Sequence, residues 1–254
     1  MKAILTGHTR GLGAAIAADL LARKIPVLGL ARSKNVELEK RFPTTLGQAE
    51  LDLADAVALA RWLGGDHLRR FLVGCKAVLL VNNAGVVQPI GSIASHDVFA
   101  ISRAVALNVA APLMLASAVV AASAEASDRR MVHVSSGAGR DAYAGWSVYC
   151  ATKAALDHHA RAVALDQTPA LRICSLAPGI VDTDMQAEIR ASTAEQFPLR
   201  AKFEALKQNG QLENPEDCAK RLIDYVLSER FGQIPVADLR HLDEPPTLPA
   251  GTDS

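Results

Sequence analysis

The chain has 254 residues, and its 27 basic residues balance 27 acidic residues. A chain without net charge lacks the electrostatic pattern of proteins that bind nucleic acid or an anionic membrane surface, and we expect neither partner. Half of the residues are hydrophobic, which is sufficient for a large buried core.

Short apolar runs alternate with alanine-rich helical patterns along the chain. The predicted strands are Ala3–Thr6, Pro26–Ala31, a weaker run near Thr45–Leu51, Ala77–Asn82, Met131–Ser135, Leu171–Ala177 and Gln233–Val236. The predicted helices are Leu12–Arg23, Ala54–Phe71, Asp97–Glu125, Val148–Asp166 and Pro215–Glu229. Most strand candidates barely alternate with polar residues, which is typical of parallel strands buried on both faces. We therefore predict an α/β fold, a doubly wound parallel sheet of about seven strands with helices on both faces.

One domain is predicted over residues 1–242, because no Pro-, Gly- or Ser-rich linker divides this part of the chain. The polar segment at about 182–212 follows a strand end, and we expect it to form a substrate lid. Residues 243–254 combine proline with polar residues and are predicted to be a disordered tail.

The cysteines form no Cys-x-x-Cys pair and lie far apart, at Cys75, Cys150, Cys174 and Cys218. This spacing argues against a disulfide framework and against a zinc site, and we expect no metal. Reduced cysteines are typical of a cytoplasmic protein. No apolar stretch of the length of a signal peptide or a membrane span is recognised, so a cytoplasmic location is expected.

A glycine-rich loop, Gly7–Gly13, joins the first predicted strand to the first predicted helix. Its spacing is Gly-x-x-x-Gly-x-Gly. Glycines allow a tight turn and let a pyrophosphate approach the backbone, and the N-terminal end of the following helix favours the negative charge. The loop is therefore a candidate dinucleotide site, with a plain strand-to-helix turn as the alternative.

Three further motifs lie at predicted strand or helix ends. Asn82-Asn83-Ala84-Gly85 ends one strand, Ser136 ends another, and the Tyr-x-x-x-Lys motif Tyr149–Lys153 lies at the start of a helix. Together with the glycine loop, these motifs resemble the short-chain dehydrogenase/reductase family. The resemblance implies a single Rossmann-type domain, an oxidoreductase activity, and NAD or NADP as cofactor.

The resemblance also implies where the cofactor is bound. Asp52 would face the adenine, with the Leu53 backbone beside it, and Thr183 would hold the nicotinamide carboxamide. A lone aspartate at a strand end is otherwise usually a cap or turn residue. The implied cofactor residues are Gly7, Thr9, Arg10, Gly11, Leu12, Gly13, Arg32, Asp52, Leu53, Asn82, Ala84, Gly85, Tyr149, Lys153, Pro178, Gly179, Val181 and Thr183.

Two arginines bear on the choice between NAD and NADP. Proteins of this fold that use NAD carry an acidic residue about 20 residues past the glycine loop. Residues Leu28–Ser33 contain no carboxylate and include Arg32. Arg32 is suited to bind a 2′-phosphate through a bidentate contact, and Arg10 is a second candidate. We predict NADPH, with two solvated surface arginines as the alternative.

Tyr149 and Lys153 are four residues apart, so they share one face of a helix. A free tyrosine has a pKa of about 10, and a nearby ammonium group is expected to lower it. Tyr149 is predicted to donate its proton to a ketone oxygen as hydride reaches the carbon. Ser136 matches the family's serine, which hydrogen-bonds the same oxygen.

Asn108 matches the fourth catalytic residue of the family. Pro112 lies four residues later and has no N–H to bond the Asn108 carbonyl in a continuous helix. That carbonyl is then free to hold a water, and we predict a proton relay through this water and Lys153 to Tyr149. An ordinary proline kink is the alternative.

Two stretches, Gly145–Ala155 and Thr183–Gln186, resemble the sepiapterin reductase branch of the family, which includes bacterial benzil reductases. This resemblance implies that the substrate is a small ketone, either an α-dicarbonyl or an aromatic or otherwise activated ketone. In that branch a C-terminal aspartate anchors the substrate. Trp146 is equally well explained as a packed structural residue. The candidate substrate residues are Tyr143, Trp146, Met185 and Asp238.

Two other functions stay open on the sequence. A 3-oxoacyl thioester reductase of the same fold would need a basic patch for an acyl carrier protein, and none is evident. A non-catalytic NADPH sensor typically lacks the tyrosine or the lysine, and both are present here. The resemblance finally implies a homodimer or homotetramer, assembled through the helices Asp97–Glu125 and Val148–Asp166.

Overall fold

The computed structural model describes residues 1–242, so the predicted tail 243–254 lies outside the described residues. Seven parallel strands form one sheet in the order β3-β2-β1-β4-β5-β6-β7. The chain winds outward from β1 to β3, crosses back, and winds outward again from β4 to β7. The prediction of a doubly wound α/β sheet is confirmed.

The bounds of the elements follow the predicted pattern closely for most of the chain. The strands are β1 Lys2–Thr6, β2 Val27–Ala31, β3 Leu46–Glu50, β4 Ala77–Asn82, β5 Asp128–Val134, β6 Leu171–Ala177 and β7 Val236–Asp238. The helices are α1 Gly11–Ala22, α2 Val36–Arg41, α3 Ala56–Leu63, α4 His67–Leu72, α5 Val98–Val105, α6 Ala111–Ala122, α7 Ser147–Leu165, α8 Asp184–Ala191, α9 Arg200–Gln208 and α10 Pro215–Leu227. The short turns η1 Ile93–Ser95, η2 Ala106–Ala110 and η3 Gly137–Gly139 complete the fold.

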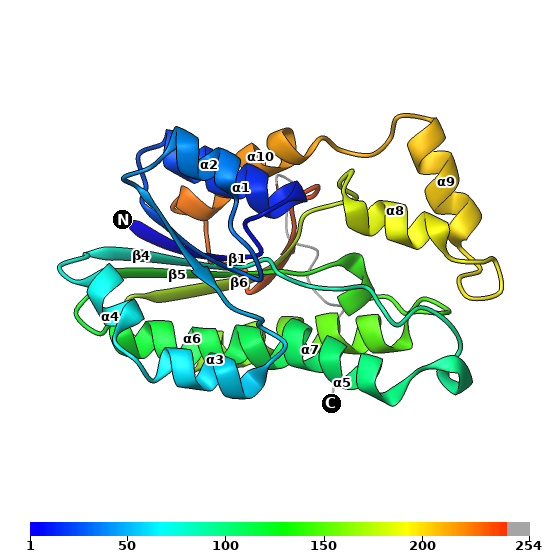
Figure 1. Ribbon diagram of the computed structural model, residues 1–254, viewed down its shortest axis with the longest axis horizontal. Coiled ribbons are helices and arrows are strands. Elements are labelled where there is room, and N and C mark those ends of the chain that lie inside the picture. The colour runs from blue at the N-terminus through cyan, green and yellow to red at the C-terminus, as the bar shows by residue number, and fades with distance from the viewer. Residues whose placement is uncertain (243–254) are drawn as a thin grey trace, which may run out of the picture.

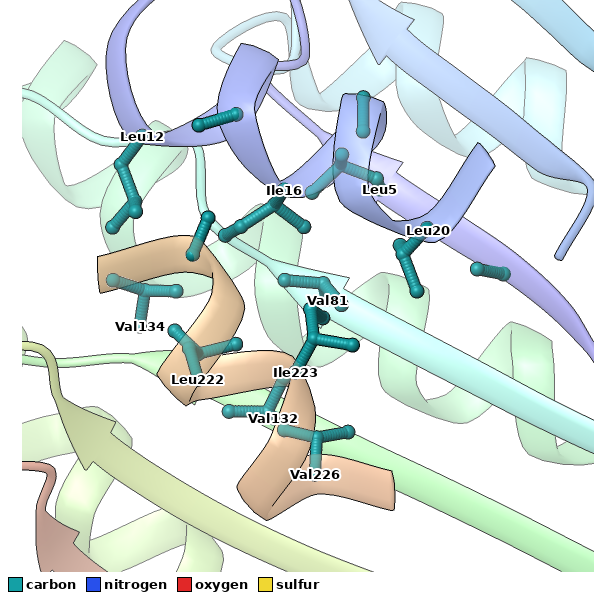
Figure 2. Packing of buried hydrophobic residues seen from close by; sticks show 14 of the residues in the cluster. Leu5, Leu12, Ile16, Leu20, Val81, Val132, Val134, Leu222, Ile223 and Val226 are labelled. Carbon is teal, nitrogen blue, oxygen red and sulfur yellow. The ribbon is translucent and has the colours of Figure 1, made fainter. Parts of the chain in front are cut away.

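Helices cover both faces of the sheet, with α1, α2 and α10 on one face and α3 to α7 on the other (Figure 1). Side chains of each strand alternate between the two cores, so that Leu5 faces the first core and its neighbour Ile4 the second. In the first core, Ile16 of α1 and Ile223 of α10 close over Val81 of β4 (Figure 2). Burial of each such side chain contributes about 2 kcal/mol.

The second core contains the helix formed by α5, η2 and α6. This helix, Val98–Ala122, is 25 residues long and contains an 18-residue window with a mean hydropathy of 2.0. It is long and apolar enough for a membrane span, which the sequence interpretation overlooked. Ala111, Leu115 and Val119 are buried in the core against the sheet. The apolar composition of α6 is therefore explained by packing on the sheet, and Phe99 of α5 stays exposed.

Two predictions of element bounds are wrong, and one helix was not predicted. Ala54–Phe71 is not one helix but two, α3 and α4, because Gly64 and Gly65 follow Leu63 and glycine disfavours helix continuation. The last strand is Val236–Asp238 rather than Gln233–Val236, because the chain is still turning at Gly232, whose φ is +81°. The helix α2 was not predicted, since Leu38 is its only buried residue and its charged sequence shows no apolar stripe.

The segment predicted as a lid contains α8 and α9, which lie beyond the carboxyl ends of the strands (Figure 1). A third cluster of buried side chains joins this segment to the start of α7. It includes Ile189 of α8, Phe203 of α9 and Phe197 between them, together with Trp146 and Tyr149. The predicted lid segment therefore packs on the start of α7, which carries the predicted catalytic residue Tyr149.

Candidate active site

A cavity of about 700 Å³ opens at the carboxyl ends of the strands. This is the place where parallel α/β sheets bind ligands, next to the point where the strand order reverses. Most of the predicted site residues line it, namely Gly7, Thr9, Arg10, Gly11, Leu12, Gly13, Arg32, Asp52, Leu53, Ala84, Gly85, Ser136, Tyr143, Trp146, Tyr149, Lys153, Pro178, Gly179, Val181, Thr183 and Met185.

The glycine loop has a shape that side chains would obstruct. A Cβ atom on Gly13 would lie 2.0 Å from the carbonyl oxygen of Gly7 and 2.5 Å from Nδ2 of Asn83. Asn83 in turn donates hydrogen bonds from Nδ2 to the carbonyl oxygens of Thr6, at 3.0 Å, and Gly7, at 3.3 Å. The start of α1 therefore faces the cavity with bare backbone, a cradle that fits the pyrophosphate of a dinucleotide.

His8 anchors the same loop to the sheet from below. Its ring is fully buried and fills a notch at Gly29 of β2, where a Cβ atom would lie 2.5 Å from the ring. Its Nε2 lies 2.7 Å from Oε1 of Gln48 on β3. Burial lowers the pKa of His8, although the Gln48 contact opposes this, so the ring is neutral at pH 7. This histidine holds the loop in place and does not line the cavity.

The arginines that line the glycine-loop end of the cavity differ in their partners. Arg10 forms an exposed ion pair with Asp184 of α8, at 3.0 Å. Asp52 is paired with Arg103 of α5, at 2.9 Å, a partner that nothing in the sequence indicated. Among residues 1–242, no carboxylate lies within ion-pair distance of Arg32. Arg32 is therefore the arginine at this end whose guanidinium is available to an anion.

The catalytic candidates meet at the centre of the cavity. Tyr149 and Lys153 are both buried on α7, with the Lys153 Nζ 5.6 Å from the centre of the Tyr149 ring. Lys153 Nζ donates a hydrogen bond to the carbonyl oxygen of Val134, at 2.8 Å, at the end of β5. Ser136 follows two residues later and lies close enough for its hydroxyl to lower the pKa of Tyr149. One strand end thus positions both partners of the tyrosine.

The pKa values of this pair differ from the sequence expectation. Burial raises the pKa of Tyr149 to about 12, outweighing the Ser136 hydrogen bond, so the lowering expected from the lysine ammonium is not found. Burial also lowers the pKa of Lys153 to about 8, with the charge of Asp157 opposing the shift. A tyrosine whose pKa is raised keeps its proton at neutral pH. This state suits a group that donates a proton to a substrate.

Asn108 lies behind the cavity wall rather than on it. It is almost fully buried within the π-helical turn η2, where the widened backbone accommodates Pro112. Its side chain donates to the Val86 carbonyl oxygen at 2.8 Å and accepts from the Val86 N–H at 2.9 Å. Asn108 therefore holds the chain segment that includes Gly85, and the proton relay through its carbonyl stays a prediction.

Asn82 and Asp238 also lie away from the cavity. Asn82 is buried on β4, where Nδ2 donates to the Pro112 carbonyl oxygen at 3.3 Å. Asp238 on β7 accepts two hydrogen bonds from the guanidinium of Arg240, at 2.9 and 2.7 Å. Arg240, two residues after Asp238, lines the cavity in its place, and the resemblance that suggested Asp238 gave no indication of this arginine.

The end of the cavity beyond Tyr149 is aromatic. The Trp146 and Phe197 rings are stacked with centroids 4.5 Å apart, and Trp146 also packs against Tyr149 at 5.3 Å and Phe203 at 5.5 Å. Trp146 is therefore both a packed residue and a cavity wall. The sequence interpretation missed Phe197 and Phe203, although two phenylalanines are a visible signal in a chain that contains only six.

Residues 1–242 contain no group of three or more metal-binding side chains. The four cysteines are unpaired, with Cys174 and Cys218 buried.

Comparison with known proteins identifies the family to which the chain belongs. A family model described as short chain dehydrogenase matches residues 1–194. The chain belongs to this family. It is therefore an oxidoreductase of a family that uses nicotinamide cofactors.

Individual relatives support the branch inferred from the motifs. Benzil reductase ((S)-benzoin forming) of Bacillus cereus is 34% identical over 242 residues, covering 91% of this chain and 95% of that protein. Sepiapterin reductase of Mus musculus is 30% identical over 244 residues, covering 90% and 92%. A short-chain dehydrogenase/reductase from Burkholderia vietnamiensis with a crystal structure is 52% identical, with a TM-score of 0.70, over 95% of this chain and 97% of that chain. The resemblance to the sepiapterin and benzil reductase branch is confirmed.

Proposed function

We propose that this short-chain dehydrogenase is an NADPH-dependent carbonyl reductase whose substrate is an α-dicarbonyl or an aromatic or otherwise activated ketone. The observation that carries the proposal is the single cavity that joins the glycine loop to Tyr149 and then to the aromatic cluster around Trp146. A dinucleotide whose 2′-phosphate lies at Arg32 and whose pyrophosphate lies at the glycine loop would have its nicotinamide beside Tyr149. A flat ketone would then lie between that end and the aromatic walls.

Arg32 supports NADPH rather than NADH. Arg32 lines the cavity just after the end of β2, and β2 itself carries no carboxylate that could bind a ribose hydroxyl. The nearby carboxylate of Asp52 is paired with Arg103. Arg10, the second candidate, is held by Asp184. We therefore assign the 2′-phosphate to Arg32. Arg10 would contribute a weaker contact to the phosphate, and only when its ion pair with Asp184 is broken.

The residues around the carbonyl have distinct roles in this proposal. The nicotinamide supplies the hydride. Tyr149 donates its phenolic proton to the carbonyl oxygen, so that the C=O bond becomes an alcohol and the tyrosine becomes a phenolate. Ser136 donates a hydrogen bond to the same oxygen, and the Lys153 ammonium stabilises the phenolate until solvent returns its proton. The water-mediated path past Asn108 is our proposal for that return.

The helices α8 and α9 act as the substrate lid in this proposal. Ile189 and Phe203 line the cavity and are also buried in the aromatic cluster. Substrate that enters between them and Trp146 would be shielded from water. Exclusion of water strengthens the electrostatic interactions of Tyr149 and Lys153 with the reacting oxygen.

The test is reduction of benzil by purified protein with NADPH, followed as the loss of absorbance of the reduced cofactor. We expect turnover with benzil or a related diketone, and about 1000-fold lower kcat/KM in Tyr149→Phe. Tight NADPH binding without turnover of any diketone or ketone would favour the sensor function. Turnover confined to 3-oxoacyl thioesters would favour the second enzyme function.

Cofactor choice has its own test. We expect Arg32→Ala to weaken NADPH binding by about 10- to 100-fold while leaving NADH binding within about threefold, because a charged hydrogen bond to phosphate contributes about 1.5–3 kcal/mol. Isothermal titration with each cofactor measures both values. Equal affinities for NADH and NADPH in the unchanged protein would remove Arg32 from this role.

We also propose a cytoplasmic homodimer or homotetramer. The outer face of α5 and the preceding turn expose Ile93, Val98 and Phe99, three large apolar side chains at 81, 69 and 81% exposure. An apolar patch of this kind is a common feature of subunit contacts. Sedimentation equilibrium is expected to give a dimer or tetramer, shifted toward monomer in Phe99→Asp. A monomer at all concentrations would contradict the proposal.

A further inference from the structure

Asp157 is a buried carboxylate in the same helix as the catalytic pair. It lies on α7 one turn after Lys153, and its side chain is 1% exposed. Its Oδ1 accepts hydrogen bonds from the hydroxyls of Ser135 and Ser175, both at 2.7 Å. Ser135 precedes the catalytic Ser136, so this carboxylate connects the serine strand end, the catalytic helix and β6.

The second oxygen of Asp157 is left largely uncompensated. Within residues 1–242, Oδ2 has no hydrogen-bond partner, and the guanidinium of Arg140 approaches only to 3.9 Å. Arg140 is also shared with Asp238, at 3.6 Å. A buried charge that its own partners do not neutralise acts strongly on neighbouring titratable groups.

Lys153 is the cation that this charge can stabilise. Its Nζ has one protein acceptor, the Val134 carbonyl oxygen, and burial lowers its pKa to about 8 while the charge of Asp157 raises it. The other ionisable groups packed around Lys153 are Tyr149 on α7 and His133 on β5, whose pKa burial lowers to about 3. Both are neutral at pH 7, so neither replaces the carboxylate.

Two other ionisable groups lie near Asp157. Arg140 lies on the loop after η3, and Cys174 lies on β6, where burial and the charge of Asp157 both raise the thiol pKa. Gly139 lies against both residues of α7, because a Cβ atom there would lie 3.0 Å from Asp157 Oδ2 and 3.0 Å from the Lys153 carbonyl oxygen. The serine loop therefore packs directly on this part of α7.

We propose that Asp157 is a positioning residue of the reduction site, which ties the Ser135–Ser136 strand end to α7 and keeps Lys153 in its ammonium form. The kinetic consequence rests on the proposed function, since Lys153 must stay charged to stabilise the Tyr149 phenolate. Without the carboxylate, Lys153 loses its proton near neutral pH, and the tyrosine loses its electrostatic partner.

The test is the titration of Lys153 by NMR in the full chain labelled with ¹³C at the lysine Cε, with Lys153→Arg used to assign the signal. Asp157→Asn keeps an oxygen for both serine hydroxyls and removes the charge. We expect the pKa of Lys153 to fall by about one pH unit in this variant, the size expected when one close opposite charge is lost.

Asp166→Asn is the matched control. Asp166 ends the same helix, is exposed, and lies 13 residues from Lys153, a separation of about 20 Å along a helix. It removes the same charge and is expected to leave the Lys153 pKa within about 0.2 units, as screening over that distance requires. An equal pKa in wild type and a folded Asp157→Asn variant would overturn the proposal.

A second variant covers the case in which Asp157→Asn does not fold. Arg140→Gln changes a half-buried side chain and removes the guanidinium that shares the Asp157 charge. The pKa of Lys153 is then expected to rise by a few tenths of a unit, the direction opposite to Asp157→Asn. A Lys153 pKa that falls or does not change in Arg140→Gln would count against the proposal in the same way.

Kinetics provide the readout that a merely structural residue would not move. In Asp157→Asn the high-pH limb of kcat/KM for carbonyl reduction is expected to shift by about one unit to lower pH. A loss of kcat with the limb in place would show a structural role only. Absence of turnover in the wild type would refute the proposed function and leave the NMR titration to decide the role of Asp157.

Discussion

The two ends of the cavity are built in different ways. The end that we assign to the cofactor is formed by one contiguous loop, Gly7–Gly13, and by residues directly after strand ends such as Arg32. The end that we assign to the substrate is formed by side chains from separate segments, with Trp146 before α7, Ile189 on α8 and Phe203 on α9. The first depends on backbone shape and the second on how distant segments pack.

This difference determines which substitutions each end tolerates. A backbone cradle fails when any side chain intrudes, as the 2.0 Å approach at Gly13 shows. A packed aromatic wall fails when a side chain is lost. The same cavity is therefore sensitive to added atoms at one end and to removed atoms at the other.

The largest effect is expected where the two ends meet. Tyr149→Phe removes the proton donor and is expected to lower kcat/KM for ketone reduction by about 1000-fold, the middle of the range for a general acid. NADPH affinity, measured by titration calorimetry, is expected to stay within about threefold. Tyr225→Phe on α10 is the matched control and keeps its activity. Equal activity of Tyr149→Phe and wild type would show that the chemistry lies elsewhere in the cavity.

The substrate end is tested by Phe197→Ala. Phe197 is fully buried in the aromatic cluster, and truncation of a buried phenylalanine costs about 3–5 kcal/mol. We expect KM for benzil to rise by about 100-fold, because the cost falls on the lid segment, while the NADPH Kd stays within about threefold. Phe231→Ala, equally buried but on the α10 side of the sheet, is expected to lower Tm and leave KM unchanged. A similar rise of KM in both variants would show that the effect is a general loss of stability and not a property of the substrate end.

The cofactor end is tested by Gly13→Ala. The added methyl group collides with the Gly7 carbonyl oxygen, and such overpacking costs about 1–3 kcal/mol. NADPH Kd is expected to rise by about 10- to 30-fold, measured by fluorescence of the bound reduced cofactor. Gly74→Ala places the same methyl group in open space on the surface, although in a residue with φ of +66°, and is expected to leave Kd unchanged. A normal Kd in Gly13→Ala would show that the cradle does not hold the cofactor.

The smallest effect is expected for the ion pair that bridges the two ends. Arg10 and Asp184 are both about 70% exposed, and exposed pairs contribute about 1 kcal/mol or less. Arg10→Met is expected to change Tm by no more than about 2 °C and the preference for NADPH over NADH by less than about threefold, with both differences vanishing in 1 M salt. A loss of NADPH preference as large as in Arg32→Ala would mean that Arg10 also binds the phosphate.

The sequence by itself determined the parts of this protein that depend on local spacing. A glycine loop after an apolar run, Tyr149 and Lys153 one helical turn apart, and parallel strands without polar alternation follow from backbone geometry, which neighbouring residues set. These features sufficed for the fold, the family and most of the residues that line the cavity.

Only the tertiary structure decided which charges are paired and which groups are buried. Arg10 and Arg32 look alike in sequence, yet Arg10 has Asp184 as a partner from 174 residues away. Asp238 is bound by Arg240, and among residues 1–242 one oxygen of Asp157 has no hydrogen-bond donor beneath the serine strand end. The pKa of Tyr149 is raised rather than lowered because desolvation is a property of the whole surrounding packing, which local spacing does not contain.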